Sequence, residues 1–324
     1  MRRMWLALSL ALTGAGCPYV RSAVRQAFDD GPPAIRVEGA TLSDGTTALP
    51  AGTVRSLSDE VFSPETADLG FFNPREFMAR APLLFYALEE PQPGKIPVLF
   101  VHGMRGSARD FAPLVERLDR SRYQPWFFQY PSGADLGQLS EAFHRLFLSG
   151  KVVRSGPSPM VVVAHSVGGL IVREALNRCT GIEEESRVVR LVTLASPMGG
   201  LSAAGGAADG VVVIRAWRDL DPQSPFIQAL HRRPLPTGLE YSLLFAFANG
   251  QKVKMGENSD GIVPLSSQLA PSAQTEARTE FGFNTTHAGI LRDPDAIQRV
   301  LALVGEAGTA PPAAGSDALS AEER

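Results

Sequence analysis

The chain has 324 residues, of which 44% are hydrophobic and 20% are charged. This apolar fraction is large enough for a substantial core and too large for a disordered chain. The formal net charge of -3 argues against a basic nucleic-acid-binding surface, so we expect no nucleic-acid partner.

The first residues have the layout of a secretory signal peptide. Arg2 and Arg3 precede an apolar run over residues 4–12, and small residues follow at 13–16. The run is too short to span a bilayer. We therefore expect residues 1–16 to be a signal peptide that is removed.

Cys17 follows Gly14-Ala15-Gly16 directly, and this placement resembles the cleavage site of bacterial lipoproteins. Those signals usually carry leucine three residues before the cysteine, where this chain has Gly14. The resemblance implies that Cys17 carries lipid and anchors the protein to a membrane. Pro18 stands in place of the aspartate that retains such proteins in the inner membrane, which favours the outer membrane of the cell envelope. The alternative is an ordinary signal peptide and a periplasmic or secreted protein.

Residues 17–79 contain Pro, Gly, Asp and Ser throughout and no long periodic stretch. We predict that they form an extended N-terminal arm with short strands, packed on a main domain of residues 80–305. Beyond that domain, residues 306–324 are rich in Ala, Gly, Pro, Ser and Glu and offer little to bury. They are predicted to be a disordered tail.

Strands and helices alternate along the main domain. Apolar or aromatic runs predict strands at 82–88, 96–101, 125–130, 160–164, 188–194 and 241–247. Helical spacing of apolar residues predicts helices at 111–118, at 136–147, from 170 onward and at 294–304. Such alternation is typical of βαβ units and a mainly parallel sheet.

The alternation breaks between the predicted strands at 188–194 and 241–247. Glycines and then prolines gather over residues 198–236. A long irregular segment within a compact fold is usually functional. We expect this segment to be a cap over the site.

A candidate nucleophile lies in Ala164-His165-Ser166-Val167-Gly168, where a predicted strand ends and a helix begins. This is the Gly-x-Ser-x-Gly pattern with Ala164 in place of the first glycine. A sharp strand-to-helix turn needs small residues around the serine and lifts its hydroxyl above the sheet edge. The pattern therefore favours Ser166 as a nucleophile.

A serine hydroxyl needs a base beside it, and that base needs a carboxylate to fix its tautomer. When the nucleophile lies on this kind of turn, the three come in the order serine, acid, histidine. His287 fits the base, and Asp260, followed by Gly261, fits the acid. Asp219 and Asp221 also lie between Ser166 and His287 and remain alternatives for the acid.

Acyl transfer also needs two backbone N–H groups to hold the developing oxyanion. One comes from the residue after the nucleophile, here Val167, and one from a loop after an earlier strand. The loop His102-Gly103-Met104-Arg105-Gly106 follows the strand predicted at 96–101. His102 and His165 stand beside these two segments, and we expect them to orient loops by hydrogen bonds. No Cys/His spacing typical of a metal site is found.

Taken together, these motifs resemble the bacterial lipase and esterase branch of the α/β-hydrolases over residues 80–305. The resemblance implies the α/β-hydrolase fold, an α/β fold with a mainly parallel central sheet flanked by helices and a cap segment. It also implies the triad Ser166, Asp260 and His287, with Met104 and Val167 as oxyanion donors. No cofactor is implied.

The expected activity is hydrolysis of carboxylic esters, with lipid esters favoured, through an acyl-enzyme on Ser166. The same triad could serve a thioesterase, a phospholipid deacylase or a peptidase, and the fold does not choose among them. A third hypothesis is an envelope lipoprotein without catalytic activity. The presence of Ser166, Asp260 and His287 argues against it.

Overall fold

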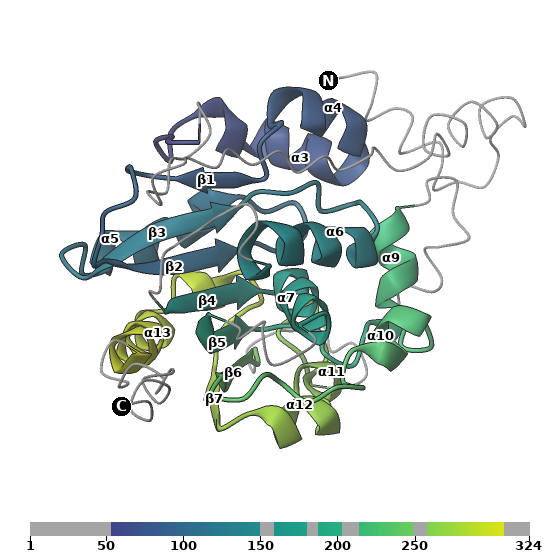
Figure 1. Ribbon diagram of the computed structural model, residues 1–324. Coiled ribbons are helices and arrows are strands. Elements are labelled where there is room, and N and C mark those ends of the chain that lie inside the picture. Colours follow the sequence, from purple (N-terminus) through teal and green to yellow (C-terminus); the bar gives the residue numbers. More distant parts are fainter. Residues whose placement is uncertain (1–52, 150–158, 180–186, 203–213, 249–257, 308–324) are drawn as a thin grey trace, which may run out of the picture.

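One seven-stranded sheet organises the molecule (Figure 1). The computed structural model describes residues 53–149, 159–179, 187–202, 214–248 and 258–307. Within them the strands are β1 (Phe85–Ala87), β2 (Ile96–Val101), β3 (Tyr123–Phe128), β4 (Met160–His165), β5 (Val188–Leu194), β6 (Glu240–Ala246) and β7 (Thr279–Phe283). Their order in the sheet is β1-β3-β2-β4-β5-β6-β7. β1 is antiparallel to β3 and every other neighbouring pair is parallel, so the predicted fold class is confirmed.

Helices connect and cover these strands. The α-helices are α3 (Pro64–Phe72), α4 (Pro74–Arg80), α5 (Ala112–Arg117), α6 (Leu136–Phe143), α7 (Val167–Asn177), α9 (Arg215–Leu220), α10 (Pro225–Ala229), α11 (Leu265–Gln268), α12 (Pro271–Glu276) and α13 (Pro294–Ala307). Short 3-10 turns are η1 (Glu60–Phe62), η2 (Ala108–Phe111) and η4 (Gly289–Leu291), and α6 continues into one π-type turn, η3 (His144–Leu148).

The central strands are buried on both faces because their sequences are continuous apolar runs. In β2, Val98 and Phe100 face one cluster of core residues, whereas Leu99 and Val101 face the other. The alternation follows from the two-residue period of a strand. Both faces of the sheet therefore require a covering layer of helices.

Each of the two faces has its own set of helices (Figure 1). α5 and α13 cover one face, to which α13 contributes the buried Ile297 and Val300. α6 and α7 cover the other, and Phe143 and Ile171 are buried there. This three-layer arrangement leaves the loops at the carboxyl ends of the strands free to carry functional side chains.

The N-terminal segment differs from the predicted arm with short strands. Residues 64–80 form the helices α3 and α4, and the only extended pairing described before β1 is the bridge between Val54 and Ala87. Ser63 and Asn73 cap the two helices through their side chains, and each helix begins with proline. Phe71 and Phe77 are buried in the main core, so the described part of this segment packs on the sheet domain.

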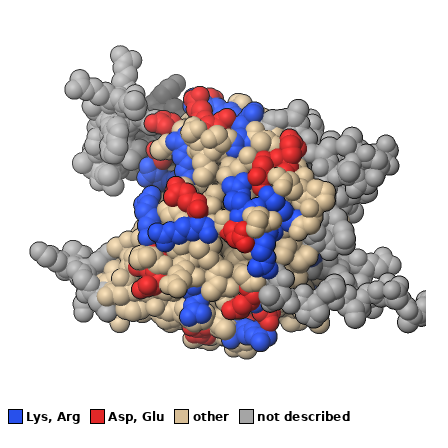
Figure 2. Space-filling model, turned by 90° about the vertical axis from the view of Figure 1, so that its left-hand side faces the viewer, with Lys and Arg blue, Asp and Glu red and all other residues tan. Residues whose placement is uncertain are grey.

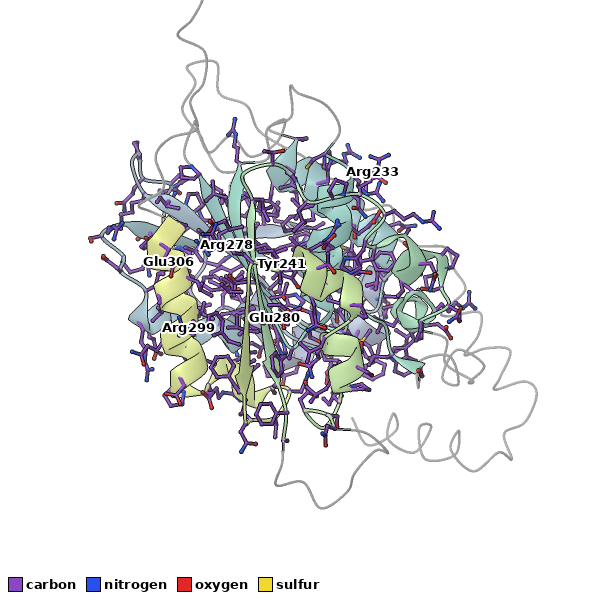
Figure 3. All side chains as sticks on the ribbon, turned by 90° about the horizontal axis from the view of Figure 1, so that it is seen from below. Arg233, Tyr241, Arg278, Glu280, Arg299 and Glu306 are labelled. Atoms are coloured by element: carbon purple, nitrogen blue, oxygen red, sulfur yellow. The ribbon has the colours of Figure 1, made fainter. Side chains whose placement is uncertain are left out.

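Charged side chains tie the end of α13 to the strands (Figure 3). Arg190 of β5 lies 3.2 Å from Glu306 and also pairs with Glu240 of β6. At the sheet edge, the Arg299 guanidinium lies 4.1 Å from the centre of the Phe281 ring in β7. α13 ends at Ala307, three residues beyond the predicted helix, and includes the first residues of the expected tail.

The surface carries charges of both signs. On the face at the left of Figure 1, basic and acidic side chains are interspersed (Figure 2). Among the described helices, none is both long and apolar enough to cross a membrane. Predictions for the signal peptide (1–16), Cys17, the arm up to residue 52, cap residues 203–213 and the tail from 308 onward lie outside the described residues.

Candidate active site

Ser166 occupies the turn between β4 and α7. Its backbone has φ 55° and ψ −129°, a region that residues with a side chain rarely adopt. The Ser166 N–H donates to the carbonyl of Leu194 at the end of the neighbouring strand β5, at 2.9 Å. Backbone strain of this kind persists only where the surrounding structure holds it, and it gathers at functional sites.

The small residues after Ser166 have a steric reason. A Cβ atom on Gly168 would lie 2.6 Å from the carbonyl oxygens of Val101 and His102. A Cβ atom on Gly169 would lie 2.2 Å from the Ser196 hydroxyl oxygen. Only glycine lets the start of α7 approach the ends of β2 and β5 this closely.

Ser166, His287 and Asp260 are joined by side-chain hydrogen bonds. The Ser166 Oγ lies 2.9 Å from His287 Nε2, and His287 Nδ1 lies 2.7 Å from Asp260 Oδ2. All three residues are buried, with Ser166 6% and His287 8% exposed. With Nδ1–H donating to the carboxylate, Nε2 is left free to accept the serine proton.

The Asp260 carboxylate is fixed by its own loop. Oδ1 accepts from the N–H groups of Ile262 and Val263 at 2.9 and 2.7 Å, and Oδ2 lies 3.3 Å from the Gln268 side-chain amide. Gly261 has φ 97°, a backbone conformation that favours glycine and lets the chain turn directly after Asp260. The His287 N–H donates to the Asp260 carbonyl at 3.0 Å, so the two loops are also joined through their backbones.

Neither alternative acid is bonded to His287. Asp219, on α9, accepts the N–H of Leu136 at 2.7 Å and so holds the start of α6. Burial raises the pKa of Asp219 to about 6. Asp221 accepts the N–H of Gln223 at 2.7 Å within a turn, and α10 is capped by Ser224 and not by Asp221.

Two backbone N–H groups are free beside Ser166. The Gly103 Cα is so close that an added Cβ would lie 3.4 Å from the Ser166 hydroxyl oxygen. Across the described residues, neither the Met104 N–H nor the Val167 N–H has a hydrogen-bond acceptor in the protein. The first belongs to the loop after β2 and the second to the first residue of α7. Unpaired N–H groups placed in this way can hold a negatively charged oxygen.

His102 orients the loop after β2, which confirms that expectation. Its Nδ1–H donates to the Gly103 carbonyl at 2.8 Å, and its Nε2 accepts the Tyr130 N–H at 3.3 Å. The ring stacks on Tyr130 with centroids 4.1 Å apart. Burial lowers the pKa of His102 to about 4, so the imidazole stays neutral at pH 7.

His165 orients the loop that carries His287, as expected from the sequence. Its Nε2–H donates to the His287 carbonyl at 3.0 Å, and the two rings have centroids 4.8 Å apart. Burial, assisted by the neighbouring His287, lowers the pKa of His165 to about 3. A neutral His165 adds no positive charge beside His287.

The described part of the predicted cap contains α9 and α10. The Leu201 N–H donates to the Leu220 carbonyl at 2.7 Å, and the Trp217 ring lies 5.7 Å from that of Phe71 in α3. The first contact joins two parts of the cap, whereas the contact with Phe71 and the bond from Asp219 to Leu136 hold α9 against α3 and α6.

The site resembles acid–base machinery built on a nucleophilic hydroxyl. Within the described ranges, no group of three or more His, Cys, Asp or Glu side chains could hold a metal ion. The described side chains form a hydrogen-bonded path from Ser166 through His287 to Asp260, beside two backbone N–H groups without an acceptor in the described residues. Such an arrangement can form and break a covalent bond at a carbonyl carbon.

Comparison with known proteins points in the same direction. The family model "Alpha/beta hydrolase family" matches residues 98–321. No curated protein sequence matches the chain.

Solved structures share the fold at low sequence identity. The mature form of lipase BlEst2 from Bacillus licheniformis is 19% identical, with a TM-score of 0.51, and the match covers 67% of this chain and 97% of that one. Its propeptide form is 18% identical, with a TM-score of 0.52 and coverage of 73% and 56%. Lipase B from Aspergillus fumigatus is 16% identical, with a TM-score of 0.51 and coverage of 81% and 62%. At such low sequence identities, the similarity shows a shared fold and nothing more.

Proposed function

Because the chain belongs to the alpha/beta hydrolase family, we propose that it is a serine hydrolase that cleaves carboxylic esters, with lipid esters as the favoured substrates. The observation that carries this proposal is the hydrogen-bonded series Ser166, His287 and Asp260 beside two free backbone N–H groups. Two of the structural neighbours are lipases, which supports the choice of lipid esters over other acyl compounds.

The proposed reaction begins with proton transfer. His287 Nε2 accepts the hydroxyl proton while Ser166 Oγ forms a bond to the ester carbonyl carbon. The carbonyl π electrons move to the oxygen, and the N–H groups of Met104 and Val167 stabilise that oxyanion. When the carbon–oxygen single bond to the alcohol breaks, the alcohol leaves with the proton from His287. Ser166 then carries the acyl group.

Water completes the cycle by the same steps. His287 takes a proton from water as the water oxygen attacks the acyl carbon, and the same two N–H groups hold the second oxyanion. The bond to Ser166 Oγ breaks, Oγ recovers the proton from His287, and the carboxylic acid leaves. Asp260 stabilises the imidazolium in each half-reaction.

The substrate class can be tested with p-nitrophenyl esters. We expect hydrolysis of both acetate and long-chain esters, and a greater rise in long-chain turnover when a lipid interface is supplied. The reason is that the cap over residues 198–236 is proposed to govern access to the acyl site. An equal response of both esters would make this segment a fixed cover, and no ester turnover at all would contradict the ester-hydrolase proposal.

For the N-terminus we propose a lipid anchor on Cys17 and a place in the cell envelope, at the outer membrane. The apolar run before Gly14-Ala15-Gly16 supports this proposal. Intact mass of the full-length protein recovered from membranes should show lipid on Cys17, and Cys17→Ser should release the protein or block its processing. An unmodified Cys17 would contradict the anchor and leave a periplasmic or secreted enzyme.

A further inference from the structure

The loop after β2 makes a tight turn in which one residue has an unusual backbone. The Gly106 N–H donates to the Gly103 carbonyl at 3.1 Å, which closes a four-residue turn with Met104 and Arg105 at its centre. Among the described non-glycine residues, only Arg105 (φ 54°), Ser166 and Ala195 have positive φ. The third position of a type II turn needs positive φ and is usually glycine or asparagine. Arg105 therefore holds a strained conformation one residue after the proposed oxyanion donor.

The Met104 N–H belongs to the peptide unit between Gly103 and Met104, and hydrogen bonds to the carbonyl of that unit hold it in place. That carbonyl belongs to Gly103 and accepts from both His102 Nδ1–H and the Gly106 N–H. Because the peptide unit is planar and trans, fixing the carbonyl on one side fixes the N–H on the other.

The next peptide unit is held from a different strand. The Arg105 N–H donates to Ser132 Oγ at 2.9 Å, and Ser132 lies in the loop after β3 and is 1% exposed. β3 and β2 are neighbours in the sheet, so their loops meet at its carboxyl edge. With both peptide units beside Met104 held, the direction of the Met104 N–H is fixed before any substrate binds.

Helix α3 supports both partners of this contact. The Gly133 N–H donates to the Gly70 carbonyl at 3.0 Å, and a Cβ atom on Gly133 would lie 1.9 Å from the Phe71 carbonyl oxygen. α3 thus sits directly against the residue after Ser132. From the same helix, Asp68 forms an ion pair with Arg105 at 2.7 Å.

We propose that Ser132 is a positioning residue for the oxyanion site, and that α3 braces it and Arg105. The Ser132 hydroxyl oxygen holds the strained turn so that the Met104 N–H points at the reacting carbonyl oxygen. This inference rests on the proposed function, because it requires Met104 to bind an oxyanion. It also gives the N-terminal segment, which precedes the residues matched by the family model, a part in catalysis.

Ser132→Ala tests the proposal, with Ser140→Ala as the matched control. Ser140 is a fully buried serine whose hydroxyl donates to the Leu136 carbonyl within α6, away from the turn. For Ser132→Ala we expect kcat on a p-nitrophenyl ester to fall about tenfold, while KM changes by no more than about twofold. The fall in kcat should be smaller than that caused by removing an oxyanion donor, because the Met104 N–H is still present. The inhibition constant of an alkylboronic acid, which forms a tetrahedral adduct with the serine, should rise by the same factor. Ser140→Ala should change neither value by more than about twofold.

Two results would overturn the assignment: wild-type kcat and boronate affinity in Ser132→Ala, or equal losses in Ser132→Ala and Ser140→Ala. If Ser132→Ala does not fold, Asp68→Asn provides a second test of the proposal. Its control is Glu76→Gln on α4, because both carboxylates are about half exposed and both pair with an arginine. Asp68→Asn should lower kcat about two- to fivefold, the range of a surface ion pair, and Glu76→Gln should not. Equal kcat values for these two would contradict the role of α3. Ester turnover by Ser166→Ala would instead contradict the proposed function itself.

Discussion

Replacing Ser166 with alanine is expected to lower ester turnover by about 10⁶-fold, the size of the loss when a serine protease loses its nucleophile. The change removes one oxygen atom and leaves no group that can form the acyl-enzyme. The backbone strain at φ 55° is carried by alanine as it is by serine, so the fold should be kept. Steady-state rates on a p-nitrophenyl ester, with circular dichroism to check folding, measure the effect.

A fluorophosphonate probe supplies the control for this experiment. It should label wild-type protein at Ser166 and leave Ser166→Ala unlabelled. Ser196 is a second buried serine close to the turn, since an added Cβ on Gly169 would meet its hydroxyl. Ser196→Ala should be labelled normally. Near-wild-type turnover by Ser166→Ala would falsify the assignment of the nucleophile.

Two of the buried strands could be predicted from the sequence to the residue. The run at 96–101 is apolar throughout, the run at 188–194 is apolar except for Arg190 and Thr193, and the structure has β2 and β5 at those positions. When a mainly apolar run is bounded by polar or turn residues, the first and last residues of the strand can be read from the pattern. Strands with a less uniform composition, such as β3, began two residues earlier than predicted.

The helices α3 and α4 were not predicted, although local signals for them exist. Ser63-Pro64 and Asn73-Pro74 are each a capping residue followed by proline at the first helical position. Both helices are short, and their largest apolar residues are adjacent pairs, Phe71-Phe72 in α3 and Phe77-Met78 in α4, rather than a periodic stripe. Packing of Phe71 and Phe77 against the sheet domain stabilises them, and that contact is tertiary.

The candidate site was predictable where its residues follow a chain order, and not where they meet only in space. The order serine, acid, histidine pointed to residues that the structure places within hydrogen-bonding distance. Ser132 lies 27 residues after Arg105, and no local pattern links the two. Their contact depends on β2 and β3 being neighbours, which is a property of the sheet.

Asp260→Asn is expected to lower turnover by up to about 10⁴-fold while the fold is kept, following the serine-protease precedent. Asparagine has the same shape, and its carbonyl oxygen can still accept the N–H groups of Ile262 and Val263. Its amide group would then face His287 Nδ1, which must become an acceptor. The ring proton would move to Nε2, the atom that faces Ser166 Oγ, and the base would be lost.

Asp219→Asn and Asp221→Asn are the matched controls, because both carboxylates lie between Ser166 and His287 in the sequence. Asp219 bonds to the Leu136 N–H and Asp221 to the Gln223 N–H, and an asparagine oxygen can accept either bond. Their kcat values on a short-chain ester should therefore stay close to that of the wild type. If Asp260→Asn keeps most of its activity while one of these two loses it, the acid belongs to the loop around α9. The bond between His287 and Asp260 would then orient the ring without supporting its charge.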